Sequence, residues 1–151
     1  FYFESYDTMW YQVQEMLRIE KGGEAQLRDE LEAYNPLIPK GRELVATVMF
    51  EIDNANIRTA FLLGLGGVEN HIIMRLDDVH IMAIAEQDLD RTNADGKASS
   101  VQFVHFNFTN SQIAKFKDIN TNVTVGINHP KYGHMAVLSD EMQRELSTDF
   151  L

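Results

Sequence analysis

The amino-acid sequence predicts an α+β fold: a largely antiparallel sheet of about five strands with helices packed on it, in a single domain over residues 1–151. First, segments with helical and with strand periodicity follow one another without the strict alternation of a βαβ fold or the uniform strands of an all-β fold. Second, 151 residues, of which 44% are hydrophobic, are enough to bury one core. Third, the chain shows no repeat, low-complexity tract or linker that would divide it.

Several segments carry helix signals. Residues 7–20 place apolar side chains at helical spacing, and residues 24–34 do so until Asn35-Pro36, where the proline ring disfavours helix for the residue before it. A helix over about residues 56–65 ends at Gly66-Gly67. The spacing of Thr109 and Gln112 predicts a capping box and a helix through Lys117, and the acidic turn after Ser139 favours a final helix.

Strand signals fall between these helices. Residues 44–52 and 122–128 are rich in β-branched side chains, and residues 71–76 and 79–85 flank Asp77-Asp78 as the arms of a hairpin. Residues 100–108 carry apolar side chains on both faces, which predicts a central strand. Residues 1–4 alternate like the end of a strand, so we expect an amino-terminal extension that this chain lacks.

The chain is strongly acidic. Its 13 Lys and Arg residues against 23 Asp and Glu residues give a net charge of -10, so it lacks the basic surface that nucleic acid or an anionic membrane requires. A cationic partner, or solubility alone, fits this charge better. The absence of cysteine excludes disulfides, thiolate catalysis and cysteine-ligated metal centres formed by this chain. No apolar run is long enough for a membrane helix and no signal peptide is recognisable, so the expected compartment is the cytoplasm.

One side of the first predicted helix carries a row of polar side chains. Helical geometry places Tyr11, Gln14, Glu15 and Arg18 on the same side of that helix, as neighbours three or four residues apart. Three interpretations remain open for this row. It is a solvated face with a weak Glu15–Arg18 pair, a buried polar network, or a ligand face on which Arg18 holds a carboxylate or phosphate and Glu15 acts as a base.

The histidines provide the other candidate site residues. His129 and His134 bracket a sequence with Pro130, Tyr132 and Gly133, and a turn there would fold the two imidazoles toward one point for metal binding or acid–base chemistry. The turn alone also explains the proline and the glycine. His105 lies within a predicted strand and reads as a core histidine with a satisfied hydrogen bond.

Motifs that would name a reaction are missing. The acidic loop over residues 86–96 does not have the spacing of a calcium-binding EF-hand, because counting from Asp88 puts Ser99 at the twelfth position. Gly64 to Gly67 lacks the Lys-Ser/Thr of a phosphate loop and is better explained as a helix stop. Whether the protein is an enzyme therefore stays open, and we expect no cofactor and no resident metal.

Five sequence motifs carry a resemblance to a known family. They are Asp7-Thr-Met-Trp-Tyr-Gln-Val-Gln-Glu-Met-Leu-Arg18, Glu32-Ala-Tyr-Asn-Pro-Leu-Ile-Pro39, Ala83-Ile-Ala-Glu-Gln-Asp-Leu-Asp-Arg91, Ser99-Ser-Val-Gln-Phe-Val-His-Phe106 and Gly126-Ile-Asn-His-Pro-Lys-Tyr132. Through them the chain resembles, nearly end to end, the bacterial DUF3501 family, whose name marks a domain of unknown function. Genes of this family often lie near genes for rubrerythrin-like proteins and iron–sulfur oxidoreductases, which implies an accessory part in peroxide or redox metabolism. Family members also carry an amino-terminal extension, and a slightly longer connection where this chain has residues 18–24.

Two hypotheses for function follow. The first is a non-catalytic accessory or interaction domain, a homodimer with a redox protein as partner, which predicts a broad apolar surface at a two-fold contact. The second is a small enzyme or ligand-binding protein with a polar site over Tyr11, Gln14, Glu15 and Arg18, joined by His129, Tyr132 or His134 and assisted by a metal at the two histidines. It predicts that these side chains meet in one cleft with a perturbed titrating group.

Overall fold

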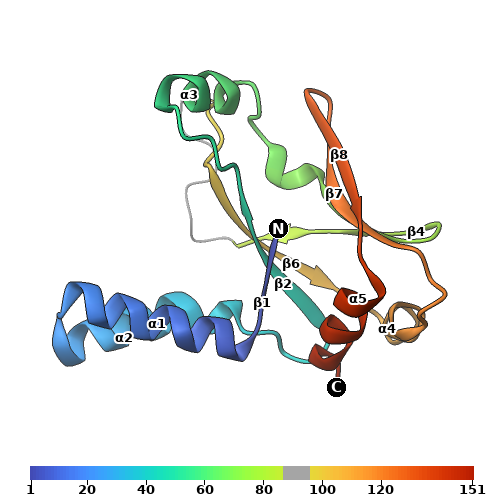
Figure 1. The fold of residues 1–151 in the computed structure, drawn as a ribbon, viewed down its shortest axis with the longest axis horizontal. Helices are drawn as coiled ribbons and strands as arrows, with labels where there is room; N and C mark the ends of the chain where they lie inside the picture. Colours follow the sequence, from blue (N-terminus) through green and yellow to red (C-terminus); the bar gives the residue numbers. More distant parts are fainter. Residues whose placement is uncertain (87–95) are drawn as a thin grey trace.

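The structure is a computed structural model that describes residues 1–86 and 96–151. It confirms the α+β class (Figure 1) and corrects the expected number of strands, because the described residues form two four-stranded antiparallel sheets. The first sheet has the order β1 (Tyr2–Glu4), β2 (Glu43–Met49), β6 (Val101–Asn107) and β5 (Ile84–Ala85). The second has the order β4 (Val79–Met82), β3 (Ile72–Leu76), β7 (Val123–His129) and β8 (Tyr132–Val137).

One stretch of chain joins the two sheets. Residues 79–85, predicted as one strand, form β4 in the second sheet and β5 in the first. Between these strands the Ala83 N–H donates to the Ile72 carbonyl at 3.0 Å, and after β5 the Glu86 N–H donates to the Phe103 carbonyl at 3.0 Å. The chain therefore changes its pairing partner at Ala83, which the hydrophobic periodicity of the segment does not reveal.

Both sheets contribute to the main hydrophobic core. Phe106 of β6, Met74 of β3 and Phe116 of α4 (Asn110–Lys117) have no exposed surface. Burial of each such side chain stabilises the fold by about 1.5–3 kcal/mol. The rings of Phe108, Phe116 and Phe150 pack edge to face with centroids between 4.7 and 5.7 Å apart, and this cluster holds α5 (Asp140–Leu146) and the 3-10 turn Ser147–Asp149 against α4.

Helices α1 (Tyr6–Glu20) and α2 (Gly23–Tyr34) form an antiparallel hairpin that projects from the sheets (Figure 1). Helix α1 begins with a capping box between Ser5 and Thr8. The buried side chain of Gln26 ties the connection, because its Nε2 donates to the Met16 carbonyl at 3.0 Å and its Oε1 accepts the Gly22 N–H at 2.6 Å. At the root of the hairpin, Met9 packs with Leu37 and Val45 in a second small core.

Capping signals predicted the starts of α4 and α5. Helix α4 begins at Thr109 with both hydrogen bonds of the predicted capping box, and the Ser139 hydroxyl accepts the Met142 N–H at 3.2 Å to start α5. Helix α3 (Ala55–Leu63) begins after Asn54, and 3-10 turns cover Asn35–Leu37 and Val68–His71. No helix within residues 1–86 and 96–151 is long and apolar enough to cross a membrane.

Two strands show what the sequence predicts and what it does not. Strand β6 lies between β2 and β5, which confirms the central position inferred from its two apolar faces. Strand β8 is absent from the sequence-based expectation, since its polar and small residues show no apolar alternation. It nevertheless pairs with β7 along its whole length. Gly126 permits this pairing, because a Cβ there would collide with the His134 carbonyl oxygen.

Candidate functional site

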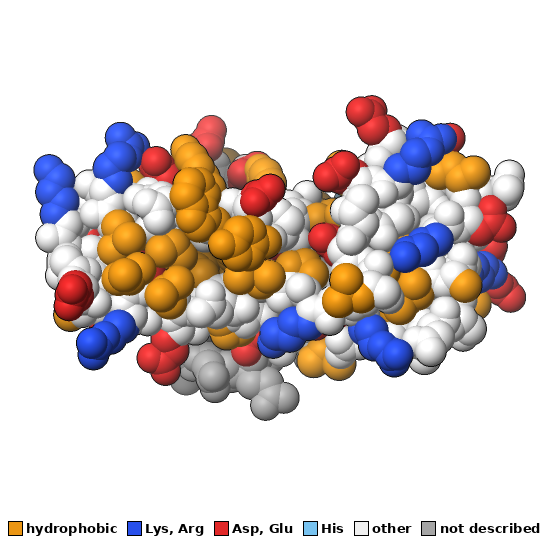
Figure 2. All heavy atoms as spheres, turned by 90° about the horizontal axis from the view of Figure 1, so that it is seen from below, with side chains coloured by type: hydrophobic (Ala, Val, Ile, Leu, Met, Phe, Trp, Pro, Cys, Tyr) orange, Lys and Arg blue, Asp and Glu red, His pale blue; other side chains and the backbone are white. Residues whose placement is uncertain are grey.

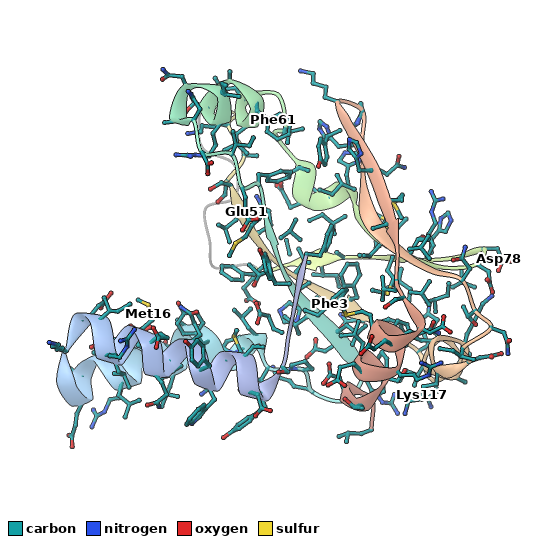
Figure 3. The ribbon with its side chains drawn as sticks, viewed as in Figure 1. Phe3, Met16, Glu51, Phe61, Asp78 and Lys117 are labelled. Carbon is teal, nitrogen blue, oxygen red and sulfur yellow. The ribbon has the colours of Figure 1, made fainter. Side chains whose placement is uncertain are left out.

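A cleft of about 940 Å³ lies at the root of the α1–α2 hairpin, between the start of α1 and α5, with β1 at its base. Seen from below, the surface is hollowed between the α1–α2 end and the rest of the molecule, and acidic side chains border the hollow (Figure 2). Phe3 lines this cleft, whereas Met16 lies farther out along α1 (Figure 3). A volume of this size suits a small ligand or a short peptide segment.

The floor of the cleft holds a buried carboxylate. Glu4, at the end of β1, is only 9% exposed. Its Oε1 accepts the Thr47 hydroxyl at 2.5 Å and its Oε2 accepts the Thr8 hydroxyl at 2.7 Å. Thr8 also completes the capping box of α1, so the start of that helix positions the carboxylate. Neither oxygen of Glu4 pairs with a cationic group among the described residues; the two threonine hydroxyls donate its hydrogen bonds.

The rim of the cleft adds three more carboxylates. Asp7 comes from the first turn of α1, Glu145 from α5 and Asp149 from the 3-10 turn that follows. Within the described part of the chain, none of these three side chains has a hydrogen-bond or ion-pair partner. Partial burial, together with the nearby charge of Glu145, raises the pKa of the Asp149 carboxyl above its ordinary value. Every charged side chain that lines the cleft is therefore acidic.

The walls of the cleft are aromatic and methionine-rich. The aromatic lining comprises Phe1, Tyr2, Phe3, Tyr11, Tyr34 and Phe103, and the methionines are Met9, Met49 and Met142. At the edge, the Tyr2 hydroxyl donates to Glu51 Oε1 at 3.0 Å, and this bond to a carboxylate raises the pKa of the tyrosine. Flexible thioethers and flat rings adapt to apolar ligands of different shape, and ring faces attract cations.

Of the polar row predicted on α1, only Tyr11 lines the cleft. Gln14 faces solvent one turn away. Arg18 Nη2 lies 2.8 Å from Glu15 Oε2, in an ion pair whose arginine side chain is 73% exposed; this pair raises the pKa of Arg18. Helical spacing would place Trp10 on the same side as Met9 and Val13, but Trp10 is more than half exposed. The structure thus joins Glu15 and Arg18 at the surface, and a ligand role for the row stays a prediction.

The histidine candidates lie in a different region, on the β7–β8 hairpin. His129 contacts His71, with ring centroids 5.0 Å apart, whereas His134 lies on Tyr132 at 4.6 Å. The two imidazoles thus contact different rings, and a joint role for them stays a prediction. The Lys131 N–H donates to Nδ1 of His129 at 3.2 Å, so a backbone hydrogen bond occupies that nitrogen. Among the described residues, no three His, Asp or Glu side chains are placed to hold a metal ion.

Two other expectations concern His105 and the acidic loop. The hydrogen-bonded histidine is confirmed: the half-buried ring of His105 places Nδ1 3.0 Å from Glu43 Oε2 and Nε2 3.0 Å from Glu86 Oε2. This interaction links β6, β2 and the end of β5. The acidic loop over residues 86–96 was compared with a calcium site. Its residues 87–95 lie outside the part of the chain that the structure describes.

Sequence reasoning missed the cleft itself. Its carboxylates come from β1, the first turn of α1 and α5, which are separated by most of the chain. No spacing rule connects Glu4 with Asp149. The sequence signals for the cleft are the high content of acidic residues and the aromatic residues of the opening segment. Neither signal shows which carboxylates lie beside which aromatic rings in the fold.

Fold and site together define an α+β domain with an acidic, aromatic-walled cleft. The family model described as "Protein of unknown function (DUF3501)" matches residues 1–150, so this chain belongs to the DUF3501 family. The chain is also similar to a crystal structure of a novel protein of unknown function from Burkholderia pseudomallei. Their sequences are 36% identical, with a TM-score of 0.87, over 98% of this chain and 77% of that chain. No curated protein matches the chain.

Proposed function

We propose that this protein is an interaction domain that holds a basic, partly apolar segment of a partner protein in the cleft between α1 and α5. One observation carries the proposal: all charged side chains that line the cleft are carboxylates, namely Glu4, Asp7, Glu145 and Asp149, whereas its walls are aromatic and methionine-rich. Such a lining matches a ligand that presents Lys or Arg side chains beside apolar ones.

The rim charges favour a cation because they are unpaired. Asp149 and Glu145 repel each other, and the raised pKa of Asp149 reflects its partial burial together with that repulsion. A Lys or Arg side chain between them replaces repulsion by attraction. The same field attracts basic partners from a distance, since the whole chain carries a net charge of -10.

The walls provide most of the affinity. A half-exposed ion pair contributes about 0.2–1 kcal/mol, so a few rim contacts account for little of a stable complex. Apolar burial contributes about 25 cal/mol per Å², and a segment that buries two or three Leu-sized side chains in the cleft gains several times more. The carboxylates therefore select the ligand and the aromatic and methionine walls hold it.

The proposal assigns the partner to redox or peroxide metabolism in the bacterial cytoplasm, as the gene neighbourhood of the family implies. In this role the domain is an accessory protein that positions or escorts its partner and performs no reaction itself. The enzymatic alternative places a substrate over Tyr11, Gln14, Glu15 and Arg18. Of these only Tyr11 lines the cleft, and Glu15 and Arg18 form an exposed ion pair. The cleft therefore supports binding better than catalysis on α1.

A peptide titration tests this function. The probe is a soluble peptide of Lys and Leu residues at helical spacing, and the matched control replaces each Lys by Glu. Trp10, the single tryptophan of the chain, does not line the cleft, so calorimetric titration measures the binding. We expect saturable binding of the Lys peptide that weakens as salt is added. No saturable binding, or equal binding of the Glu peptide, would overturn the proposal.

A further inference from the structure

The β7–β8 hairpin lies in one of two long acid-free segments of a strongly acidic chain; the other, residues 96–117, contains the central strand β6. From Ile119 to Ser139 the sequence contains no Asp or Glu, although 23 acidic residues occur in the whole chain. The same segment carries Lys131, His129 and His134. At a net charge of -10, two copies of this protein repel each other wherever their acidic surfaces meet. Two copies that meet at this hairpin avoid that repulsion.

Strand β8 also has a free edge. It is the outer strand of its sheet, and every residue from Gly133 to Val137 is exposed. The other outer strands are shorter: β1 has 3 residues, β5 has 2 and β4 has 4, against 6 in β8. Proteins normally protect such an edge with charged side chains, proline or a bulge. Residues 132–137 contain no charged residue and no proline.

The hydrogen-bond pattern shows which backbone groups are available. The Leu138 N–H donates to the Val123 carbonyl at 2.9 Å, and the pairing with β7 continues back to Tyr132 opposite His129. In an antiparallel ladder, bonded and non-bonded residue pairs alternate. The N–H and C=O groups of Gly133, Met135 and Val137 therefore point away from β7, toward the open edge.

We propose that a second copy of this chain pairs with this edge, β8 against β8 in antiparallel orientation, so that the two four-stranded sheets become one continuous sheet across a two-fold axis. With Met135 on the axis, all outward backbone groups of both strands find partners. In that register Val137 lies opposite Gly133 of the partner subunit. No heavy atom lies within 4 Å of where a Cβ of Gly133 would stand, so there is room for the valine side chain.

This interface uses a different surface from the cleft. Pairing through β8 leaves Glu145 and Asp149 free, and a dimer would carry two open clefts. Oligomeric state and peptide binding can therefore fail separately, and each tests only its own proposal. The pairing also supplies the two-fold contact that the interaction-domain hypothesis expects, through backbone hydrogen bonds instead of a broad apolar surface.

Sedimentation velocity of the purified chain tests the interface. We expect a species of twice the 17.3 kDa chain mass that becomes more populated as salt screens the net charge. Val137→Lys puts a charged side chain on the pairing edge, as in protected natural edge strands, and should raise the dimer dissociation constant roughly tenfold or more. Ile57→Lys is the matched control, because Ile57 on α3 is 61% exposed and Val137 is 69% exposed. This control should remain dimeric.

Amide hydrogen exchange at high and low protein concentration locates the contact. The outward amides of Gly133, Met135 and Val137 should be protected only where the dimer is populated, whereas the inward amides of His134 and Ala136 should be protected at both concentrations. A wild-type chain that stays monomeric throughout would overturn the proposal. A dimer that survives Val137→Lys, with its outward amides exchanging freely, would overturn it equally.

Discussion

Two regions of this molecule are rich in carboxylates, and the surroundings of the carboxylates differ between the two regions. In the β3–β4 turn, Asp77 and Asp78 form ion pairs with Lys115, and in the loop after α4, Asp118 accepts hydrogen bonds from Asn120. These interactions lower the pKa of each carboxyl. In the cleft, Asp149 and Glu145 have no cationic partner within the described chain, and the pKa of Asp149 is raised. The same side-chain chemistry stabilises the fold in the first region and is left available for a ligand in the second.

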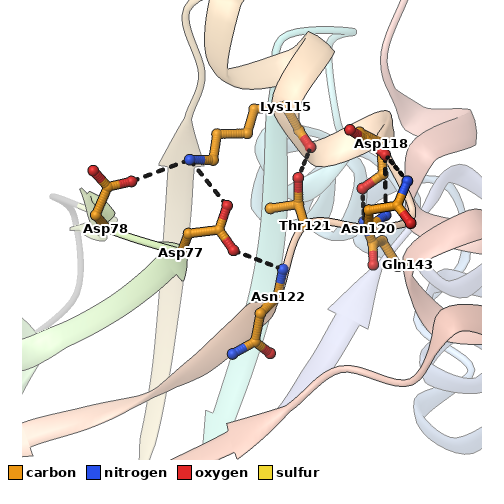
Figure 4. A network of polar contacts seen from close by, with 8 residues as sticks. All are labelled: Asp77, Asp78, Lys115, Asp118, Asn120, Thr121, Asn122 and Gln143. Carbon is orange, nitrogen blue, oxygen red and sulfur yellow. Dashed lines mark hydrogen bonds and ion pairs between the residues drawn. The ribbon is translucent and has the colours of Figure 1, made fainter.

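The paired region is a connected network (Figure 4). Lys115 Nζ lies 3.0 Å from Asp77 Oδ2 and 3.1 Å from Asp78 Oδ1, and the Asn122 N–H donates to Asp77 Oδ1 at 3.0 Å. The Asn120 N–H donates to Asp118 Oδ1 at 3.0 Å. These contacts hold the β3–β4 turn, α4 and the start of β7 together. The three carboxylates therefore stabilise the fold and are not available to bind a ligand.

The largest expected effect concerns the buried end of this network. Gln143 of α5 is 3% exposed, and its Nε2 donates to the Phe116 carbonyl at 2.7 Å and to the Asp118 carbonyl at 3.0 Å. Gln143→Leu leaves both carbonyls without this donor and should lower the free energy of unfolding by about 2–3 kcal/mol. Gln14→Leu, an exposed control on α1, should change it by less than about 0.5 kcal/mol. Urea denaturation measures the change in unfolding free energy for both variants. Equal losses in the two variants would show that the network does not anchor α5.

A smaller effect, visible mainly through pH, is expected at Asp77. Because the pKa of Asp77 is lowered from 3.8, its ionised form stabilises the fold above that pH, and this contribution disappears as the pH falls below 3.8. Asp77→Asn keeps a residue type that tolerates the left-handed turn at φ 54° but removes the charge. The variant should be less stable at neutral pH and approach wild type in strong acid. A stability difference that does not depend on pH would contradict this assignment.

Asp149 should respond with the opposite sign. Its raised pKa means that the folded state favours the protonated form, so wild-type stability declines as the pH rises from 3.8 through the folded-state pKa. Asp149→Asn should therefore be slightly more stable than wild type at neutral pH and equal to it in strong acid. Asp29→Asn on α2 makes the same change in net charge and separates the local effect from the general one. Thermal melts across this pH range measure the effect. If Asp149→Asn were destabilising at neutral pH, the ionised Asp149 carboxylate would not be unfavourable in the folded state.

The smallest effect is expected on the outer face of α1. Arg18 and Glu15 form an exposed pair beyond the cleft. Arg18→Ala should leave both the unfolding midpoint and binding of the Lys peptide unchanged within error, since exposed pairs contribute little. Loss of peptide binding in this variant would move the site from the cleft to the predicted polar row.

The sequence predicts local features of this fold because their physics is local. The capping box of Thr109 and Gln112 depends on residues one helical turn apart, and the Glu15–Arg18 pair follows from helical spacing alone. Spacing does not reveal burial, however, so the same reasoning placed Trp10 on the apolar side although it is largely exposed. Strand β8 escaped prediction because an edge strand exposed on both faces needs no apolar alternation.

The cleft could not be predicted because it exists only in the tertiary structure. Glu4 and Asp149 lie near opposite ends of the chain and meet through the packing of β1, α1 and α5. The ring contacts of His129 and His134 also depend on the tertiary structure. Cross-strand pairing sets His129 against Tyr132 and His134 against Ile127, while His71, from another segment, contacts the first of them.

A charge reversal on α5 tests the central claim most directly. Glu145 lines the cleft, and Glu141, one helical turn earlier, is exposed but does not line it. Calorimetric titration with the Lys peptide should show at least about a tenfold loss of affinity, or about 1.4 kcal/mol, for Glu145→Lys and wild-type affinity for Glu141→Lys. If the two variants lose affinity equally, the protein attracts cations through its net charge alone, and the cleft is not the binding site.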